Sequence, residues 1–329
     1  MQPDSTDHFS FVFIGDVQDT LRGKTRGFME NVRHRYPQAD FYMFAGDFAE
    51  RPMNCYWDEA YQSVDSIAPT KPILVSPGNH EYVKGLVRVL EKRFAYVFSY
   101  LLESRYKNNN VYSVAAENMY NAIKDVVANA EGQVIIGEVN QDATAQNIQQ
   151  RGGGFIDKMI ELLQADGKTV AVKGNEFYVN AAKGADAKEA DADVVIQVAV
   201  PAQTTVELCS TEAQAILSQE NCIAIFGSNQ TAAEGVLAAN ANLNVLGSDA
   251  AAGDVIGVGF DAGSIIKAAV QDGTFIGAVT QSPLMMGYYA IYALTAAANG
   301  QELEDVPTDG YWYDSTNMDS EEIAPNLYD

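Results

Sequence analysis

Three short polar clusters in the first hundred residues carry side chains that could bind a metal ion. Gly15-Asp16, Gly46-Asp47 and Gly78-Asn79-His80-Glu81 each follow a short apolar run. Because the carboxyl ends of parallel strands meet at one edge of a sheet, these polar tips should lie together. Their oxygen and nitrogen donors suit a divalent ion such as Mn, Fe or Zn. One Gly-Asp after a strand is weak evidence, since Asp often caps the helix that follows.

The runs between these tips predict a layered α/β unit. Apolar runs of strand length alternate with stretches of helical spacing. Strands are expected at residues 9–14, 41–45 and 73–75, and helices at residues 24–36, 56–66 and 83–102. Such alternation predicts a parallel sheet with helices packed on it.

Residues 9–106 resemble the first half of the calcineurin-like metallophosphoesterases, on the three tips in this order. The resemblance implies that Asp16 binds a first divalent metal, that Asp47 bridges two metals and that Asn79 binds the second. His80 would protonate the leaving group or steady the transition state. The two metals would clamp the phosphate and generate a hydroxide nucleophile.

The pattern departs from that family at several metal ligands. Gln18 stands where many members carry a histidine, and the chain has no histidine after His80, although the family uses further histidines in its second half. Asp16, Asp47 and Asn79 would then hold a single ion weakly, with Gln18 and water completing its shell. The sequence therefore predicts an incomplete hydrolase site with negligible turnover.

Residues 115–329 follow a second, longer α/β pattern. Strands are expected at residues 133–137, 169–172, 194–199, 222–226, 255–259 and 275–279. Helices are expected at residues 146–164, 176–189, 204–218, 231–241, 263–271 and 284–298. Strands and helices that alternate over this length predict a doubly wound parallel sheet.

Four polar residues fall at strand ends or in first helical turns of this second pattern. They are Arg151, Asn229, Asp261 and Gln281. Taken singly, a residue such as Asn229 is more simply a cap or turn residue. Together they form a set that recognises hydroxyl groups, because these planar side chains donate and accept hydrogen bonds in pairs. The set favours a sugar-binding site.

Four motifs of this region resemble the type I periplasmic sugar-binding proteins of the ribose- and galactose-binding type. The motifs are RGGGF, IFGSNQTAAEG, GVGFDAG and VTQSPLMMGYYA. The resemblance implies that the four polar residues contact a monosaccharide from the C-terminal lobe, without a cofactor. An aromatic side chain of the other lobe would stack on the sugar, and Trp312 and Tyr313 would pack near the hinge. It also implies an extracytoplasmic location and a membrane transporter permease as partner.

The composition narrows the classes of function. The net charge of −23 argues against nucleic-acid binding, because phosphate contacts need a basic face. No apolar run reaches the length of about 18 residues that a membrane-spanning helix needs. The first residues, MQPDSTDHFS, lack the features of a signal peptide, which leaves a cytoplasmic protein or a removed signal as alternatives. For Cys55, Cys209 and Cys222, buried free thiols are favoured over a Cys209–Cys222 bridge.

The charge is spread unevenly along the chain. Residues 1–106 contain 12 Lys and Arg against 14 Asp and Glu, whereas residues 107–329 contain 9 against 30. An asymmetry of this size is a domain-level signal. It predicts a metallophosphoesterase-like half domain at residues 1–106 and a sugar-binding lobe at residues 107–329.

Two incomplete α/β units in one chain are the resulting prediction. The predicted function is monosaccharide binding of the solute-binding-protein type, fused to a truncated metallophosphoesterase segment. The alternatives are a metal-dependent phosphoesterase and an artificial fusion with neither activity. Surfaces that the missing halves would normally cover are expected to make the chain self-associate.

Overall fold

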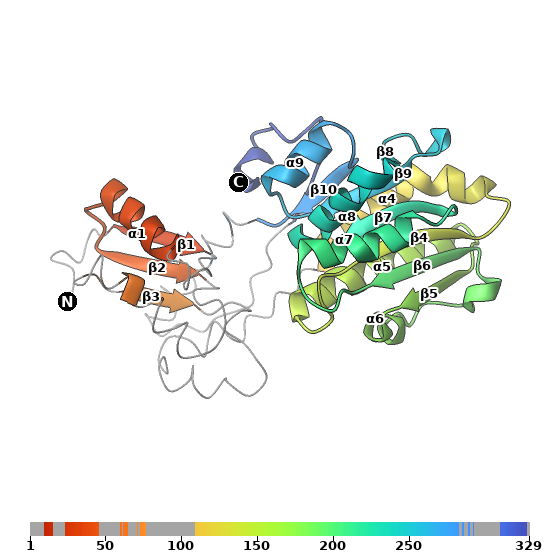
Figure 1. Cartoon of the computed structure of the whole chain (residues 1–329), viewed down its shortest axis with the longest axis horizontal. Coiled ribbons are helices and arrows are strands. Elements are labelled where there is room, and N and C mark those ends of the chain that lie inside the picture. The colour runs from red at the N-terminus through yellow and green to blue at the C-terminus, as the bar shows by residue number, and fades with distance from the viewer. Residues whose placement is uncertain are drawn as a thin grey trace. The chain divides into compact units, whose positions relative to one another are not determined.

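The computed structural model divides the chain into two compact units (Figure 1). Unit 1 comprises Met1–Tyr106 and Met286–Val306, and unit 2 comprises Lys107–Met285 and Pro307–Asp329. The structure describes residues 10–15, 24–45, 60, 62–64, 71, 73–76, 109–282, 285, 289, 292 and 310–327. Within these residues, no helix has the length and apolar character needed to cross a bilayer.

Unit 1 contains a three-stranded parallel sheet in the order β1 (Phe11–Gly15), β2 (Phe41–Ala45), β3 (Ile73–Ser76). Helix α1 (Lys24–Arg35) connects the first two strands. Phe11 pairs with Phe41 in the sheet, and their rings stack with centroids 5.0 Å apart. The three strands and their parallel order confirm the layout predicted from the apolar runs.

The five residues proposed as metal ligands or catalytic groups in this unit lie outside the described residues. They are Asp16, Gln18, Asp47, Asn79 and His80. The structure therefore does not test whether their side chains converge. The expected helix at residues 83–102 lies outside the described residues as well.

Unit 2 is built around an eight-stranded sheet. Its path is β11-β10-β9-β7-β4-β6-β5, with β8 paired to β9, and only β11 runs antiparallel to its neighbour. The strands are β4 (Val134–Val139), β5 (Val170–Gly174), β6 (Val194–Ala199), β7 (Cys222–Gly227), β8 (Leu246–Gly247), β9 (Val255–Phe260), β10 (Gly277–Thr280) and β11 (Tyr311–Tyr313). This order confirms the predicted doubly wound parallel sheet.

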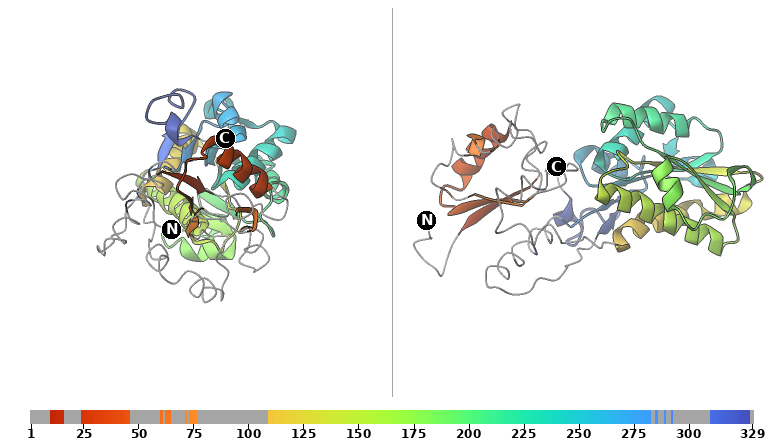
Figure 2. Two further views of the ribbon diagram at one scale, coloured as in Figure 1. Left: turned by 90° about the vertical axis from the view of Figure 1, so that its left-hand side faces the viewer. Right: turned by 90° about the horizontal axis from the view of Figure 1, so that it is seen from below.

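Helices cover both faces of this sheet (Figure 2). They are α4 (Asn109–Asn129), α5 (Gln146–Ala165), α6 (Glu176–Ala181), α7 (Val206–Leu217), α8 (Gln230–Leu243) and α9 (Ser264–Gln271), with short 3-10 helices η2 (Glu189–Asp191), η3 (Ala250–Ala252) and η4 (Ala324–Asn326). Alternate residues of β4 point to opposite faces, so Ile136 joins a core with Phe155 of α5, and Ile135 joins a core with Ile216 of α7. The strands are continuous apolar runs in the sequence, as expected for a parallel sheet that helices cover on both faces.

Several elements differ from the sequence-based expectation. Helix α6 ends at Ala181 instead of running to residue 189, and the chain continues as turns before η2. Helix α4, strands β8 and β11, and the short 3-10 helices η3 and η4 were not predicted. Cys209 and Cys222 are buried free thiols, as expected, while Cys55 lies outside the described residues.

The packing of α7 against α8 depends on a glycine. An alanine Cβ at Gly235 would lie 2.4 Å from Cβ of Cys209, with backbone atoms at 2.9 Å, whereas a Cβ at Gly153 of α5 would meet nothing within 4 Å. We expect Gly235→Ala to lower the free energy of unfolding by about 1–3 kcal/mol through overpacking. Gly153→Ala should raise it by up to about 1 kcal/mol through helix propensity. Urea unfolding followed by circular dichroism measures both, and shifts of the same sign would contradict the packing argument.

Candidate functional site

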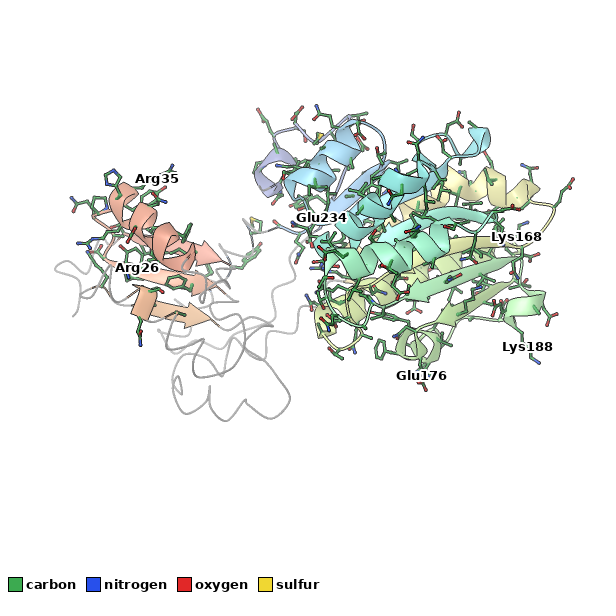
Figure 3. The ribbon with its side chains drawn as sticks, in the orientation of Figure 1. Arg26, Arg35, Lys168, Glu176, Lys188 and Glu234 are labelled. Carbon is green, nitrogen blue, oxygen red and sulfur yellow. The ribbon has the colours of Figure 1, made fainter. Side chains whose placement is uncertain are left out.

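The four predicted sugar-binding residues of unit 2 lie at the carboxyl edge of its central strands. Arg151 is in the second turn of α5, which follows β4, and Asn229 precedes α8 after β7. Asp261 directly follows β9, and Gln281 directly follows β10. In Figure 3, Glu234 in α8 is near this edge, and Lys168, before β5, is at the opposite end of the sheet.

Arg151 and Asp261 form an ion pair that is almost removed from solvent. Nη1 of Arg151 lies 3.3 Å from Oδ2 of Asp261, and the two residues are 6% and 8% exposed. Nη1 also donates to the carbonyl oxygen of Ser228 at 3.4 Å. The guanidinium carbon lies 4.1 Å above the centre of the Phe260 ring, a cation–π arrangement. These contacts fix the direction in which the guanidinium points.

Asp261 collects hydrogen bonds from three other elements. Oδ2 accepts from the backbone N–H of Gln230 at 3.0 Å, and Oδ1 accepts from Nε2 of Gln281 at 2.9 Å. The first of these donors lies at the N-terminus of α8, where the helix dipole favours a negative charge. The carboxylate therefore connects α5, α8 and the end of β10.

The backbone of Asp261 is in the left-handed region, with φ of 75°. This conformation is uncommon outside glycine, although Asp and Asn tolerate it better than most residues. Its N–H donates to the carbonyl of Val279 at 2.8 Å, and its own carbonyl accepts from the Tyr313 hydroxyl at 2.7 Å. Strands β10 and β11 thus fix the turn that orients the Asp261 carboxylate.

Asn229 has two roles in the structure. Its Oδ1 accepts from the backbone N–H of Ala232 at 3.2 Å and so caps α8, as the simpler reading of this residue predicted. Its Nδ2 donates to Oε1 of Gln141 at 2.5 Å, and the residue is 6% exposed. Because Oδ1 of Asn229 caps the helix, its Nδ2 points to Gln141 in the loop that follows β4.

Sequence reasoning missed the residues that support this network. Phe260 and Gln141 belong to it, and Phe260 could have been found because it immediately precedes Asp261. Tyr313 also belongs to it, through its hydroxyl and a ring that is fully buried against the sheet, and its expected place near a hinge stays a prediction. The Trp312 ring packs against Gly277, where a Cβ would lie 2.2 Å from it. The spacing of residues near Trp312 and Tyr313 in the sequence does not predict these contacts.

Two polar side chains lie beneath α5 on the same edge. Glu138 and Asn140 are both 0% exposed, and Nδ2 of Asn140 donates to Oε1 of Glu138 at 2.7 Å. Oε2 of Glu138, Oδ1 of Asn140 and Oγ of Ser228 are buried without a hydrogen-bond partner in the described part of the chain. Burial raises the pKa of Glu138 well above its usual range, and the Asn140 hydrogen bond offsets this only in part.

Across the described residues, no group of three or more His, Cys, Asp or Glu could hold a metal ion. The predicted ion ligands of unit 1 are not among these residues, so a divalent metal there stays a prediction. In unit 2 the donors of the site are an arginine, amides and a carboxylate that is already paired with a cation. This set suits a neutral hydroxylated ligand better than a metal ion.

Residues 73–302 match the sequence model of the family described as "Periplasmic binding protein domain". The chain belongs to this family. Comparison with curated proteins by sequence gives no match. The matched range includes β3 of unit 1 and strands β4 to β10 of unit 2.

Solved structures of periplasmic binding proteins and their relatives share the fold of the whole chain. An ABC transporter, LacI family transcriptional regulator from Brachyspira murdochii is 20% identical, with a TM-score of 0.60, covering 99% of this chain and 100% of that one. A solute-binding protein from Agrobacterium vitis with α-D-tagatopyranose is 15% identical, with a TM-score of 0.52 and coverage of 98% and 100%. One from Agrobacterium radiobacter with D-arabinose is 16% identical, with the same TM-score and coverage.

These matches correct the interpretation of the first hundred residues. The family range begins at residue 73 and includes Asn79 and His80, and the structural matches extend over nearly the whole chain. The comparisons therefore do not support the metallophosphoesterase resemblance, nor a truncated hydrolase fused to a sugar-binding lobe. The reason is physical: strands that end in Gly-Asp occur in many parallel α/β sheets, because Asp caps the next helix.

The prediction of self-association loses its premise as well. It assumed two half domains whose missing partners would leave apolar surface uncovered. The family match and the structural match each include residues of both units, so the comparisons do not support two unrelated half domains. The comparisons give no support for self-association.

The ion pair at the centre of the site can be tested by a double-mutant cycle. We expect Asp261→Asn and Arg151→Met each to lower the free energy of unfolding by about 3–5 kcal/mol, because each leaves one buried charge uncompensated. The double variant should cost less than the sum, with a coupling energy of about 0.5–3 kcal/mol. Chemical denaturation of the four proteins measures it. Additive single effects would show that the two side chains do not depend on each other.

Proposed function

We propose that this chain is the solute-binding protein of an ABC transporter and that it binds a monosaccharide. Arg151, Asn229, Asp261 and Gln281 contact the sugar hydroxyls from unit 2. The observation that carries the proposal is the Asp261 carboxylate, which three donors from separate elements hold in one orientation. A buried, oriented carboxylate beside a guanidinium and two amides offers acceptors and donors to neighbouring hydroxyl groups.

The chemistry of the set matches a sugar. Each hydroxyl group donates one hydrogen bond and accepts two, so vicinal hydroxyls pair well with planar side chains that present adjacent donors or acceptors. The Asp261 carboxylate accepts, the Arg151 guanidinium donates, and the amides of Asn229 and Gln281 do both. No step of this recognition needs a cofactor.

Selectivity for a sugar follows from the cost of burying polar groups. A polar atom of the site that exchanges a hydrogen bond within the protein for one to a sugar hydroxyl loses little free energy. A ligand that lacks the hydroxyl leaves the same atom without a hydrogen bond. Unpaired buried donors and acceptors cost roughly 1–3 kcal/mol each. The site therefore favours ligands with hydroxyls at the positions that these side chains reach.

The structural neighbours support the class of ligand. Those named with α-D-tagatopyranose and D-arabinose share the fold of this chain, and both ligands are monosaccharides. In this proposal the chain delivers the sugar to a membrane permease outside the cytoplasm. The net charge of −23 leaves nucleic acid outside the proposed partners.

The proposal can be tested by calorimetry against a pentose and hexose panel that includes D-arabinose and D-tagatose. Arg151→Ala should weaken the best ligand at least about 30-fold, since truncating a buried hydrogen-bonded charge costs about 2 kcal/mol or more. Lys158→Ala is the matched control, because Lys158 is a basic residue of the same helix that pairs with Glu161. Tight binding that survives Arg151→Ala would overturn the site, and no binding across the panel would overturn the ligand class.

The two roles of Asn229 can be separated by two substitutions. Asn229→Asp keeps an oxygen that caps α8, while loss of the Nδ2 donor should weaken sugar binding about tenfold. Asn229→Ala loses the cap as well and should be destabilised by about 0.5–2 kcal/mol. Thermal unfolding and calorimetry on the same samples measure both effects. An Asn229→Asp variant with unchanged affinity would limit Asn229 to capping.

A further inference from the structure

The pair of buried polar side chains beneath α5 has an unusual hydrogen-bond pattern. Glu138 and Asn140 are two residues apart on β4 and its extension, so both point to the face that α5 covers. One hydrogen bond joins them, from Nδ2 of Asn140 to Oε1 of Glu138 at 2.7 Å. The second oxygen of each group, Oε2 and Oδ1, is buried and has no partner in the described part of the chain.

Two acceptor oxygens cannot bond to each other unless one of them carries a proton. A neutral carboxylic acid has one O–H donor, and a side-chain amide has both a donor and an acceptor. An acid and an amide that already share one N–H···O bond can close a ring with an O–H···O bond between their remaining oxygens. A proton on Oε2 of Glu138 would satisfy both unpartnered atoms at once.

Among the residues that the structure describes, no cation is paired with the Glu138 carboxyl group. Among the described residues, Tyr178 of α6 lies at the same Gly152 as Glu138, and Arg151, the residue before Gly152, is paired with Asp261. Burial is the largest cause that raises the pKa of Tyr178. A buried, unpaired carboxylate is among the costliest groups in a protein interior.

Helix α5 packs closely on the pair through Gly152. A Cβ added at Gly152 would lie 2.5 Å from Oε1 of Glu138, 2.7 Å from Nδ2 of Asn140 and 2.7 Å from Cε1 of Tyr178. The backbone of α5 therefore rests directly on the hydrogen-bonded side of the pair. Gly152 directly follows Arg151 in α5, so the Glu138–Asn140 pair supports the helix next to the residue that pairs with Asp261.

We propose that Glu138 is a neutral carboxylic acid in the folded protein, and that it forms a ring of two hydrogen bonds with the Asn140 amide that positions Arg151 through α5. Oε2–H of Glu138 donates to Oδ1 of Asn140, and Nδ2–H of Asn140 donates to Oε1 of Glu138. When the group ionises, the proton leaves to solvent, the first of these bonds is lost and an uncompensated charge lies under α5. Glu138 is thus a positioning residue for the site and touches no ligand itself.

The raised pKa of Glu138 agrees with this arrangement, and it fixes the sign of the pH effect. The folded state keeps a proton that the unfolded chain gives up near the ordinary glutamate value. Stability from this group is therefore complete below that value and falls as the pH rises, until the folded-state pKa is passed. Substitution by glutamine removes the titration and keeps the ring, because its amide also offers one donor and one acceptor.

The first test compares the chain with Glu138→Gln as a function of pH, with Trp57→Phe in both so that Trp312 reports on unit 2. Above the ordinary glutamate value, the unfolding equilibrium constant of the parent should rise relative to that of Glu138→Gln by about tenfold per pH unit, until the folded-state pKa is reached. Glu131→Gln, an exposed glutamate just before the same strand, is the matched control. Parallel curves for the parent and Glu138→Gln across this range would overturn the proposal.

A second measurement needs no stable variant. Infrared difference spectra of the unmodified chain labelled with ¹³C-carboxyl glutamate should show the carbonyl stretch of a protonated, hydrogen-bonded acid at neutral pH, and titration to high pH should convert it to the carboxylate bands. Absence of that band at neutral pH would also overturn the proposal. This readout does not depend on the identity of the ligand.

The part of the proposal in which Glu138 positions Arg151 for ligand binding rests on the proposed function. For the sugar identified by calorimetry, the affinity of the parent should fall at high pH while the affinity of Glu138→Gln keeps a flatter profile. Glu138→Leu leaves the Asn140 amide without a partner and should bind weakly at every pH. If the infrared band is present and no sugar binds, the proposed function fails and the neutral acid stands. If sugar binds and both pH profiles coincide, the positioning role fails.

Discussion

The buried ion pair between Arg151 and Asp261 is the interaction on which the site of unit 2 depends. Both charges lie out of water, where an ion pair is favourable only if its geometry is good and its remaining hydrogen bonds are satisfied. The structure meets these conditions with the Phe260 ring beneath the guanidinium and with two further donors on the carboxylate. Removing either charged partner leaves a buried charge that its neighbours cannot compensate.

The end of the chain takes part in this arrangement. The Tyr313 hydroxyl holds the Asp261 carbonyl, and Thr280 and Ser282 donate from their hydroxyls to the carbonyl and the side-chain oxygen of Asn326 at 2.9 and 3.2 Å. The last described residues therefore close over the strand end that carries Gln281. These contacts explain how Asp261 keeps a left-handed backbone conformation at the sheet edge. Strands β10 and β11, which are distant in the sequence, fix its backbone on both sides.

The sequence predicted the sheet and the four polar residues because both leave local signals. Buried strands are continuous apolar runs, and Arg151, Asn229, Asp261 and Gln281 follow them directly. Tyr313 gave no such signal, since its partner lies 52 residues away. Gly-Asp tips misled the reading of the first hundred residues, because the same dipeptide caps helices in unrelated α/β proteins. Glu138 was overlooked, although an acid within an otherwise apolar strand is itself a signal.

Two carboxyl groups at one sheet edge therefore meet opposite environments. Asp261 has a guanidinium, the N-terminus of a helix and an amide donor around its two oxygens. Glu138 is fully buried with one amide donor, and its burial, which favours the neutral form, outweighs that hydrogen bond. An ionised acid can only accept hydrogen bonds, whereas a neutral one can also donate. Arg151 pairs with Asp261, and the next residue, Gly152, lies against the Glu138–Asn140 pair, so the two acids contact adjacent residues of α5.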